Sequence, residues 1–304
     1  MYEQHFGLHE APFRVTPDTD YYFAHRHHQE ALNVLLFGVS NGEGFIKVSG
    51  EVGTGKTLLC RKLLKLAEGR FVTAWIPNPA LEPTALAEAL AEELGTQAPR
   101  ALGQHRQLKQ IYQRLVRIAD AGGHTLVCID EAQAMPDETL EALRLLSNLE
   151  AEKRKLMTVV LFGQPELDQR LATQGLRQLR NRIGLAYRLR PLDRGAVEQY
   201  VVHRLRIAGA PRADTLFRPR ALRALHRASR GLPRLINILA HKSLLAAFGR
   251  QQAVVDRDHV RRAAADTEDA NAVSRLEWSD WAALTLPASA LILVAVARIL
   301  LERA

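Results

Sequence analysis

The chain has 304 residues, of which 47% are apolar and 24% are charged, as in an ordinary folded protein. Its two cysteines, Cys60 and Cys128, are too few for a disulfide framework and lack metal-ligand spacing. Both lie in apolar runs, so we expect them to be small buried residues. The first ten residues, MYEQHFGLHE, hold no apolar leader core, which excludes a signal peptide there.

The net charge of +8 is unevenly distributed. Residues 170–262 hold 21 Lys/Arg against 5 Asp/Glu, a net charge of +16, so the rest of the chain carries −8. This asymmetry suggests an anionic partner for the second half: nucleotide phosphates, nucleic acid or an acidic membrane surface. The alternative is a solvated, arginine-rich helical surface.

The first strong local signal lies in residues 44–67. GFIKVSG (44–50) predicts a buried strand, and KTLLCRKLLKLA (56–67) predicts a helix. Between them, GEVGTGKT matches the phosphate-loop pattern G-x-x-x-x-G-K-[ST] in full. Glycines let backbone N–H groups face an anion, and the N-terminus of the helix adds partial positive charge. The alternative is a structural turn. The expected nucleotide-binding residues are Gly50, Glu51, Val52, Gly53, Thr54, Gly55, Lys56, Thr57 and Leu58, with Lys56 on the β- and γ-phosphates and Thr57 on Mg²⁺.

Strands and helices then alternate along the chain. Strands are expected at 70–77, within TLVCIDEAQ (125–133), at 156–167 and at 185–192, and helices at 28–40, 82–95 and 104–121. Such alternation indicates a parallel sheet covered by helices on both faces. Beyond residue 191 the pattern is purely helical: 194–208, 219–229, 232–248 and 256–270. We therefore predict an α/β nucleotide-binding domain at 1–192, a helical lid at 193–272 and a linker with a membrane anchor at 273–304.

A second acidic signal follows the strand TLVCI. Asp130 and Glu131 come directly after it, at the strand end that faces the ligand crevice in a parallel sheet. Asp130 is expected beside Mg²⁺, and Glu131 is expected to polarise the water that attacks the γ-phosphate. An apolar run ending in Asp-Glu is weak evidence alone, but it becomes strong after a full phosphate loop.

With these motifs the sequence resembles the AAA+ ATPases. The resemblance implies a P-loop NTPase fold: a doubly wound parallel sheet with a C-terminal helical lid. It places a polar sensor at Gln164, where Asn or Thr is more usual. It also places an arginine finger, which reaches a neighbouring subunit's nucleotide, at Arg182 or else Arg180. The string GLPRLIN (231–237) resembles the sensor 2 motif, with Arg234 contacting the γ-phosphate. For each arginine, the alternative is a surface residue in an arginine-rich region.

Several strings narrow the resemblance: YEQHFGLHEAPF, TPDTDYYF, HQEAL, GQPEL and GLPRLIN. Together they are similar to the ATPases related to general secretion pathway protein A, particularly those of mannose-sensitive haemagglutinin (MSHA) pilus biogenesis. This resemblance implies ATP and Mg²⁺ as cofactors, and ATP-driven assembly of a homo-oligomer, either a dimer or a ring. It also implies base contacts near the N-terminus, at Phe6, Gly7, Leu8 and Phe13.

The C-terminal sequence has an apolar run. Residues 282–297 carry no charge, and Trp281 with a snorkelling Arg298 extends the run to 281–301, about 31 Å of helix. Proline 287 and the weakly apolar Ala, Ser and Thr leave a buried helix in an oligomer interface as the alternative. We expect a transmembrane anchor in the inner membrane, with the ATPase on the cytoplasmic side. The related secretion protein continues into a peptidoglycan-binding domain, so any role at peptidoglycan is expected to need a partner protein.

The sequence thus leads to two hypotheses. The first is a membrane-anchored ATPase that works with inner-membrane proteins to assemble a type IV pilus or secretion complex. The second is a nucleic-acid-handling AAA+ ATPase of the transposition or replication-helper type, which would account for the positively charged half. A nucleotide switch with little turnover is a third possibility, which the carboxylates and arginines disfavour.

Overall fold

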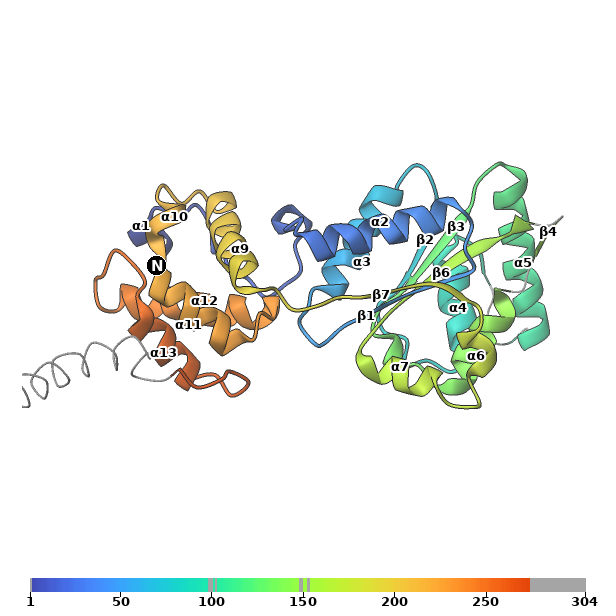
Figure 1. Ribbon diagram of the computed structural model, residues 1–304. Helices are drawn as coiled ribbons and strands as arrows, with labels where there is room; N and C mark the ends of the chain where they lie inside the picture. Colours follow the sequence, from blue (N-terminus) through green and yellow to red (C-terminus); the bar gives the residue numbers. More distant parts are fainter. Residues whose placement is uncertain (1, 98–100, 102, 148–149, 152–153, 274–304) are drawn as a thin grey trace, which may run out of the picture.

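The computed structural model describes residues 2–97, 101, 103–147, 150–151 and 154–273. Figure 1 shows an α/β part built on a sheet and a helical part, the lid. The five strands are parallel and run in the order β2-β3-β6-β1-β7. Their bounds are Phe45–Ser49 for β1, Val72–Ile76 for β2, Thr125–Ile129 for β3, Met157–Gly163 for β6 and Ile183–Arg188 for β7. Because β6 lies between β1 and β3, the loops after these three strands meet at one edge of the sheet.

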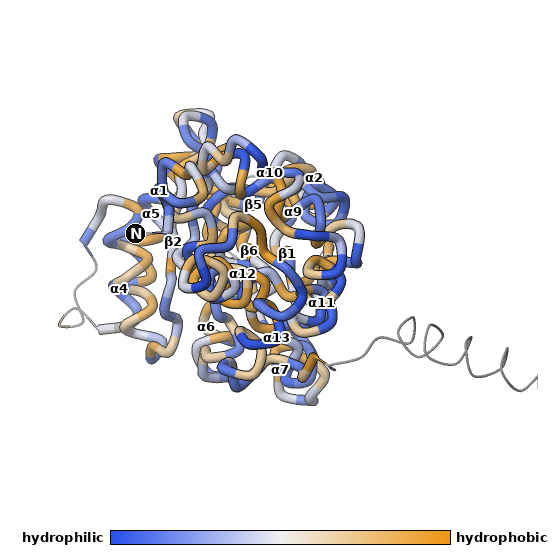
Figure 2. Tube along the Cα trace, turned by 90° about the vertical axis from the view of Figure 1, so that its left-hand side faces the viewer, coloured by the Kyte–Doolittle hydropathy of each residue, from blue (hydrophilic) through white to orange (hydrophobic). Residues whose placement is uncertain are grey.

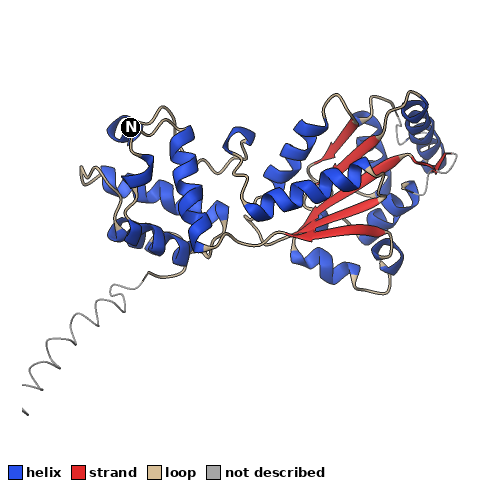
Figure 3. Ribbon diagram, turned by 45° about the horizontal axis from the view of Figure 1, so that its top comes forward, coloured by secondary structure: helices blue, strands red, loops and turns tan. Residues whose placement is uncertain are grey.

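Alternate residues of each strand pack on opposite faces, as a strand's period of two requires. One face, with Ile46 and Val48, is covered by α2 (Arg26–Ser40) and α3 (Lys56–Ala67). The other face, with Phe45 and Val159, is covered by the remaining helices of this part. These are α4 (Pro83–Glu93), α5 (Gln104–Asp120), α6 (Asp137–Leu146), α7 (Pro165–Leu171) and α8 (Arg177–Arg180). Figure 3 shows helices on both faces, and Figure 2 shows apolar strands at the centre. The prediction of a parallel sheet between helical layers is confirmed.

Three short elements complete the α/β part: the 3-10 turn η3 (Ala132–Ala134) and the hairpin of β4 (Glu150–Ala151) and β5 (Arg154–Lys155). Sequence patterns did not reveal them because each is only two or three residues long, too short to show a repeating pattern. Cys60 and Cys128 are free and fully buried, as expected.

The lid consists of α9 (Arg194–Ile207), α10 (Ala213–Leu216), α11 (Pro219–Ser229), α12 (Pro233–Phe248) and α13 (Arg257–Ala265). The change from alternating to helical architecture occurs between Arg188 and Arg194. At this junction the Leu192 N–H donates to Gly231 O at 2.8 Å. This hydrogen bond joins the segment between β7 and α9 to the residues just before α12.

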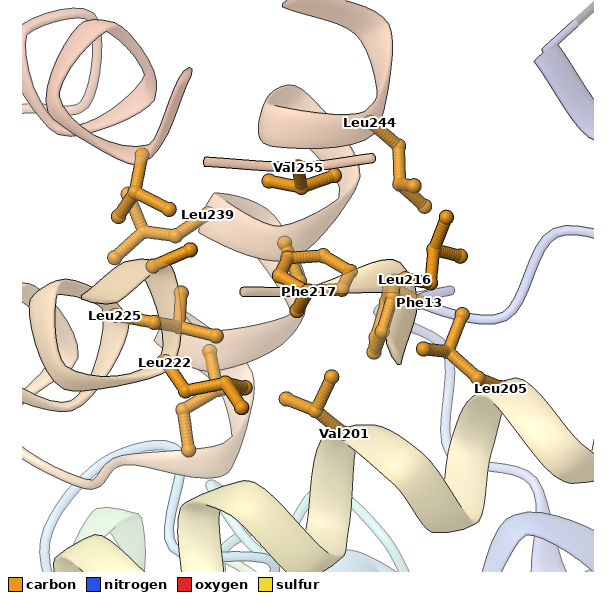
Figure 4. Packing of buried hydrophobic residues seen from close by; sticks show 14 of the residues in the cluster. Phe13, Val201, Leu205, Leu216, Phe217, Leu222, Leu225, Leu239, Leu244 and Val255 are labelled. Carbon is orange, nitrogen blue, oxygen red and sulfur yellow. The ribbon is translucent and has the colours of Figure 1, made fainter. Parts of the chain in front are cut away.

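The N-terminal segment packs in the lid, which corrects its expected place in the α/β domain. It begins with α1 (Tyr2–Phe6) and includes the 3-10 turn η1 (Thr19–Tyr21). The Phe13 ring lies edge-on to Phe217 in the lid core, with 6.0 Å between ring centroids (Figure 4). The aromatic side chains of this segment complete the apolar core of the lid. The segment therefore packs with the lid although the α/β part follows it directly along the chain.

The expected membrane anchor at 281–301 lies outside the described residues. Among the residues that the structure does describe, no helix combines the length and apolar character needed to cross a membrane.

Candidate active site

The phosphate loop joins β1 to α3 as a turn stabilised by its own lysine. Lys56 Nζ donates to Gly50 O at 2.7 Å and to Glu51 O at 3.0 Å. Gly53 and Gly55 have φ of +78° and +98°, a region that favours glycine. The loop therefore has the backbone conformation that its glycine spacing predicts.

Lys56 is 4% exposed and lies among carboxylates. Burial lowers the pKa of Lys56, while Glu131 and Asp130 act in the opposite direction. A buried ammonium surrounded in this way is a strong site for an incoming phosphate, which supplies further compensating charge.

Asp130 follows β3 and is 3% exposed. Burial raises the pKa of its carboxyl group, and a hydrogen bond from the Thr57 hydroxyl opposes that rise. Asp130 and Thr57 thus place two oxygen donors together beside the loop, a set that suits Mg²⁺. Among the described residues, no group of three or more His, Cys, Asp or Glu side chains is placed to hold a metal ion. A magnesium site completed by waters and substrate phosphates needs none.

Glu131 has an unusual backbone conformation, and two glutamine side chains bond its carboxylate. Its φ is +51°, in the left-handed region that non-glycine residues rarely adopt. Its Oε2 accepts from Gln133 Nε2 at 2.6 Å and from Gln164 Nε2 at 3.1 Å. Burial raises the pKa of Glu131, but the two amide hydrogen bonds and the charge of Lys56 outweigh burial, so the net shift is downward. Glu131 is therefore kept ionised, as a group that accepts a proton or hydrogen bond from water must be.

Gln133 connects the ends of two strands. While its Nε2 donates to Glu131, its Oε1 accepts from the backbone N–H of Gln164 at 2.9 Å. The Gln133 carbonyl accepts from Arg170 Nη1 at 2.6 Å, and Arg170 also pairs with Asp137. This network fixes the orientation of the Gln133 amide, since a flipped amide would face a donor with a donor.

The lid closes over the loop. The Arg234 N–H donates to Gly53 O at 3.1 Å, and a Cβ at Gly53 would lie 2.8 Å from Arg234 Cβ. A cavity of about 240 Å³ lies here, and Lys56, Thr57, Glu131 and Arg234 all line it. Glu131 and Arg234 therefore line the same cavity as six of the predicted loop residues: Val52, Gly53, Gly55, Lys56, Thr57 and Leu58. Gly50, Glu51, Thr54 and Asp130 are not among the residues that line it.

Residues 39–171 match the family model of the AAA domain. Over these residues the chain is similar to the AAA domain family. Over 250 residues it is 42% identical to general secretion pathway protein A from Aeromonas hydrophila. That alignment covers 82% of this chain but 45% of the relative, so the chain spans less than half the relative's length.

Solved structures share the fold at low sequence identity. A crystal structure of Cdc6p from Pyrobaculum aerophilum superimposes with a TM-score of 0.64 and 18% identity, covering 87% of this chain and 70% of that one. The ORC1 protein of Aeropyrum pernix, in complex with DNA, gives a TM-score of 0.58 and 21% identity, with coverage of 84% and 69%. At these identities the similarity shows the α/β P-loop fold of the AAA domain and its lid.

The expected base contacts, Phe6, Gly7, Leu8 and Phe13, do not line this cavity. Phe6, Leu8 and Phe13 are buried in the lid core, and Gly7 lies against Pro211. The chain reaches the cavity immediately afterwards, at residues 14–18, which line it.

Residues of the lid and of α3 hold this short strap, residues 12–18, in place. Arg204 Nε donates to Pro12 O at 2.6 Å, Asn237 Nδ2 donates to Arg14 O at 3.2 Å, and Arg61 Nη1 donates to Pro17 O at 3.0 Å. The strap is therefore bonded to the lid on one side and to α3 on the other.

The two candidate finger arginines lie away from their own cavity. Arg180 and Arg182 are exposed, and Arg182 directly precedes β7. Ile183, the next residue, pairs with Phe45 at the start of β1. The phosphate loop begins at the other end of β1, about 16 Å along a five-residue strand. This position leaves both side chains outside the subunit's own site.

Several contributors to the site were missed from the sequence, among them Gln133, Arg204 and Asn237. Gln133 lies two residues after Glu131, in the turn that follows β3. No sequence pattern in that turn distinguishes its side chain as one that bonds Glu131. Arg204 and Asn237 lie on lid helices among many other polar residues, so only tertiary structure distinguishes them.

Proposed function

We propose that this protein is a magnesium-dependent ATPase. The observation that carries the proposal is the shared cavity, in which a buried lysine, a loop hydroxyl and an ionised carboxylate converge. The same cavity is closed by a lid arginine and by the strap.

Each residue of the site has a separate role in the proposed hydrolysis. Lys56 and the loop N–H groups bind phosphate oxygens, and Arg234 approaches them from the lid. Thr57 and Asp130 would hold Mg²⁺, which would supply positive charge to neutralise the phosphates. Glu131 accepts a hydrogen bond from the attacking water and orients it. Gln164 is the polar sensor beside the γ-phosphate. Because it also donates a hydrogen bond to Glu131, it connects the γ-phosphate to the carboxylate that orients the water.

Comparison of the wild type with Lys56→Ala tests this activity. The wild type hydrolyses MgATP, and Lys56→Ala loses both binding and turnover. Lys65→Ala is the matched control, because Lys65 is an exposed lysine of the same helix. A wild type that neither binds nor hydrolyses ATP contradicts the proposal.

We further propose that the active form is a homo-oligomer in which Arg182 acts on the neighbouring subunit. Its exposure and its distance from the subunit's own loop support this role. Lys56→Ala subunits still offer Arg182, and Arg182→Ala subunits still offer an intact loop. A mixture of these two inactive variants therefore regains activity if the arginine acts in trans, whereas each alone stays inactive. If Arg180 is the finger, Arg180→Ala behaves this way instead.

The biological setting we propose is assembly of a secretion complex or type IV pilus at the inner membrane. The similarity to general secretion pathway protein A supports it, as does the apolar sequence of residues 281–301. The full chain should remain with membranes after a carbonate wash and be released by detergent. Its partners should co-purify from the detergent extract.

A second candidate function is handling of nucleic acid. A groove of about 660 Å³ on the lid is lined by Arg218, Arg220, Arg223 and Arg257, together with two aspartates. Binding to duplex DNA that weakens steeply between low and moderate salt would favour this function. Absence of such binding, with retained membrane association, favours the first.

A further inference from the structure

A buried ring lies directly against the phosphate loop. It belongs to His28, which is in the first turn of α2 and is 8% exposed. Its Nε2 lies 2.9 Å from Thr54 O, and a Cβ placed on Gly55 would lie 3.2 Å from the same nitrogen. The ring thus fills the space that the absence of a side chain at Gly55 leaves open.

The contact fixes the protonation of the ring. A carbonyl oxygen accepts hydrogen bonds only, so Nε2 must carry the proton. Nδ1 is buried and has no hydrogen-bond partner among the described residues. Burial also lowers the pKa of His28. The ring is therefore a neutral donor with its proton on Nε2.

This donor determines the direction of one peptide unit of the loop. The Thr54–Gly55 peptide is trans, so its C=O and N–H point in opposite directions. A carbonyl held toward His28 turns the Gly55 N–H away from the ring. Gly55 and Lys56 both line the cavity. Gly55 has a φ of +98°, which glycine adopts without strain, and it directly precedes α3. Its lack of a side chain leaves room for the His28 ring.

We propose that His28 is a positioning residue that sets the Thr54–Gly55 peptide in the orientation that binds a nucleotide phosphate. His28 lines no part of the cavity and acts through the Gly55 N–H. The proposal rests on the proposed function of the cavity as a nucleotide site. A histidine that only fills the core would change stability and leave phosphate affinity unchanged.

Two substitutions at His28 separate these roles. His28→Leu removes the donor, whereas His28→Gln keeps an N–H at nearly the same distance from Cα. Affinity for MgATP is measured by calorimetry on the full chain, with thermal melting beside it. His27→Leu is the matched control, because His27 is the neighbouring histidine and pairs with Glu30 rather than with the loop. ¹⁵N NMR of the ring nitrogens of the wild type reports the tautomer without any nucleotide.

We expect His28→Leu to bind MgATP about tenfold more weakly than wild type, because a buried carbonyl loses its donor. His28→Gln should remain within about threefold of wild type, His27→Leu should match wild type, and NMR should show the proton on Nε2. A folded His28→Leu with wild-type affinity, or a proton on Nδ1, overturns the inference. If His28→Leu does not fold, two measurements still test the inference: the MgATP affinity of His28→Gln and the tautomer of the wild-type ring. The inference then fails if His28→Gln falls outside the threefold range or if the proton is on Nδ1. If the wild type binds no MgATP, the proposed function fails, while the tautomer still tests the geometry.

Discussion

Gln133 Nε2 lies 2.6 Å from Glu131 Oε2, a short amide-to-carboxylate hydrogen bond between two residues of the same turn. Gln164, from the neighbouring strand end, donates to the same oxygen at 3.1 Å. Two glutamine side chains from outside the phosphate loop therefore fix the direction of the carboxylate that is proposed to orient water.

Replacement of Gln133 should separate turnover from binding. In Gln133→Met the Glu131 carboxylate loses a charge-assisted hydrogen bond, so we expect kcat to fall by about tenfold or more. Affinity for MgATP should stay within about twofold, because Gln133 does not line the cavity. Steady-state kinetics and calorimetry measure the two quantities. Gln113→Met, on the exposed side of α5, is the control; equal kcat in Gln133→Met and Gln113→Met would count against this role.

Arg234 should matter more for ATP than for ADP. Its backbone already bonds Gly53, so Arg234→Ala keeps that contact and removes only the guanidinium. If the guanidinium meets the γ-phosphate, Arg234→Ala weakens ATP binding about tenfold and ADP binding little. Arg230→Ala, on the preceding turn, serves as the control. Equal losses for both nucleotides would place the guanidinium elsewhere.

Gly231 has no room for a side chain. Its φ is +76°, and a Cβ there would lie 2.0 Å from Leu192 O. Gly231→Ala should lower the free energy of unfolding by about 2–4 kcal/mol, through backbone strain and a clash at the lid junction. Gly175→Ala is the control, since nothing lies within 4 Å of the added atom. Chemical denaturation compares them, and equal stabilities would mean that the junction is more open than the structure has it.

The protein should lose stability as the pH falls below about 6.5. Burial lowers the pKa of five histidines: His28, His124, His203, His241 and His259. Their folded pKa values lie below the unfolded value of about 6.5, so in this window the unfolded chain binds more protons. Stability from these groups is therefore complete above the unfolded pKa and declines as the pH falls through it.

Thermal melts at pH 7.5 and 5.5 check this expectation. The Tm should be lower at pH 5.5, and the difference should shrink in His124→Gln, which cannot take up a proton. An equal or higher Tm at pH 5.5 would contradict it.

The sheet and the core of the site could be predicted from the sequence for a physical reason. Phosphate binding needs glycines, Lys56 and Thr57 at fixed spacing along one turn, and Asp130 needs a strand end, so both leave local patterns. Burial on both faces makes the strands continuous apolar runs, which are equally visible.

The remainder depends on contacts between distant segments. The family resemblance implies a base contact at Phe13, yet Phe13 packs in the lid core, where Phe217 is an aromatic partner. The pairing of Gln133 with Gln164 and of His28 with Thr54 joins positions 31 and 26 residues apart. No periodicity along one segment can report such pairs.

The most direct test of the account is turnover by Glu131→Gln, measured together with MgATP affinity. The amide keeps the shape of the side chain but cannot accept a proton from water, and Lys56 and Thr57 are untouched. The account predicts MgATP binding close to wild type, with kcat lower by at least about a hundredfold. Hydrolysis at the wild-type rate would contradict it.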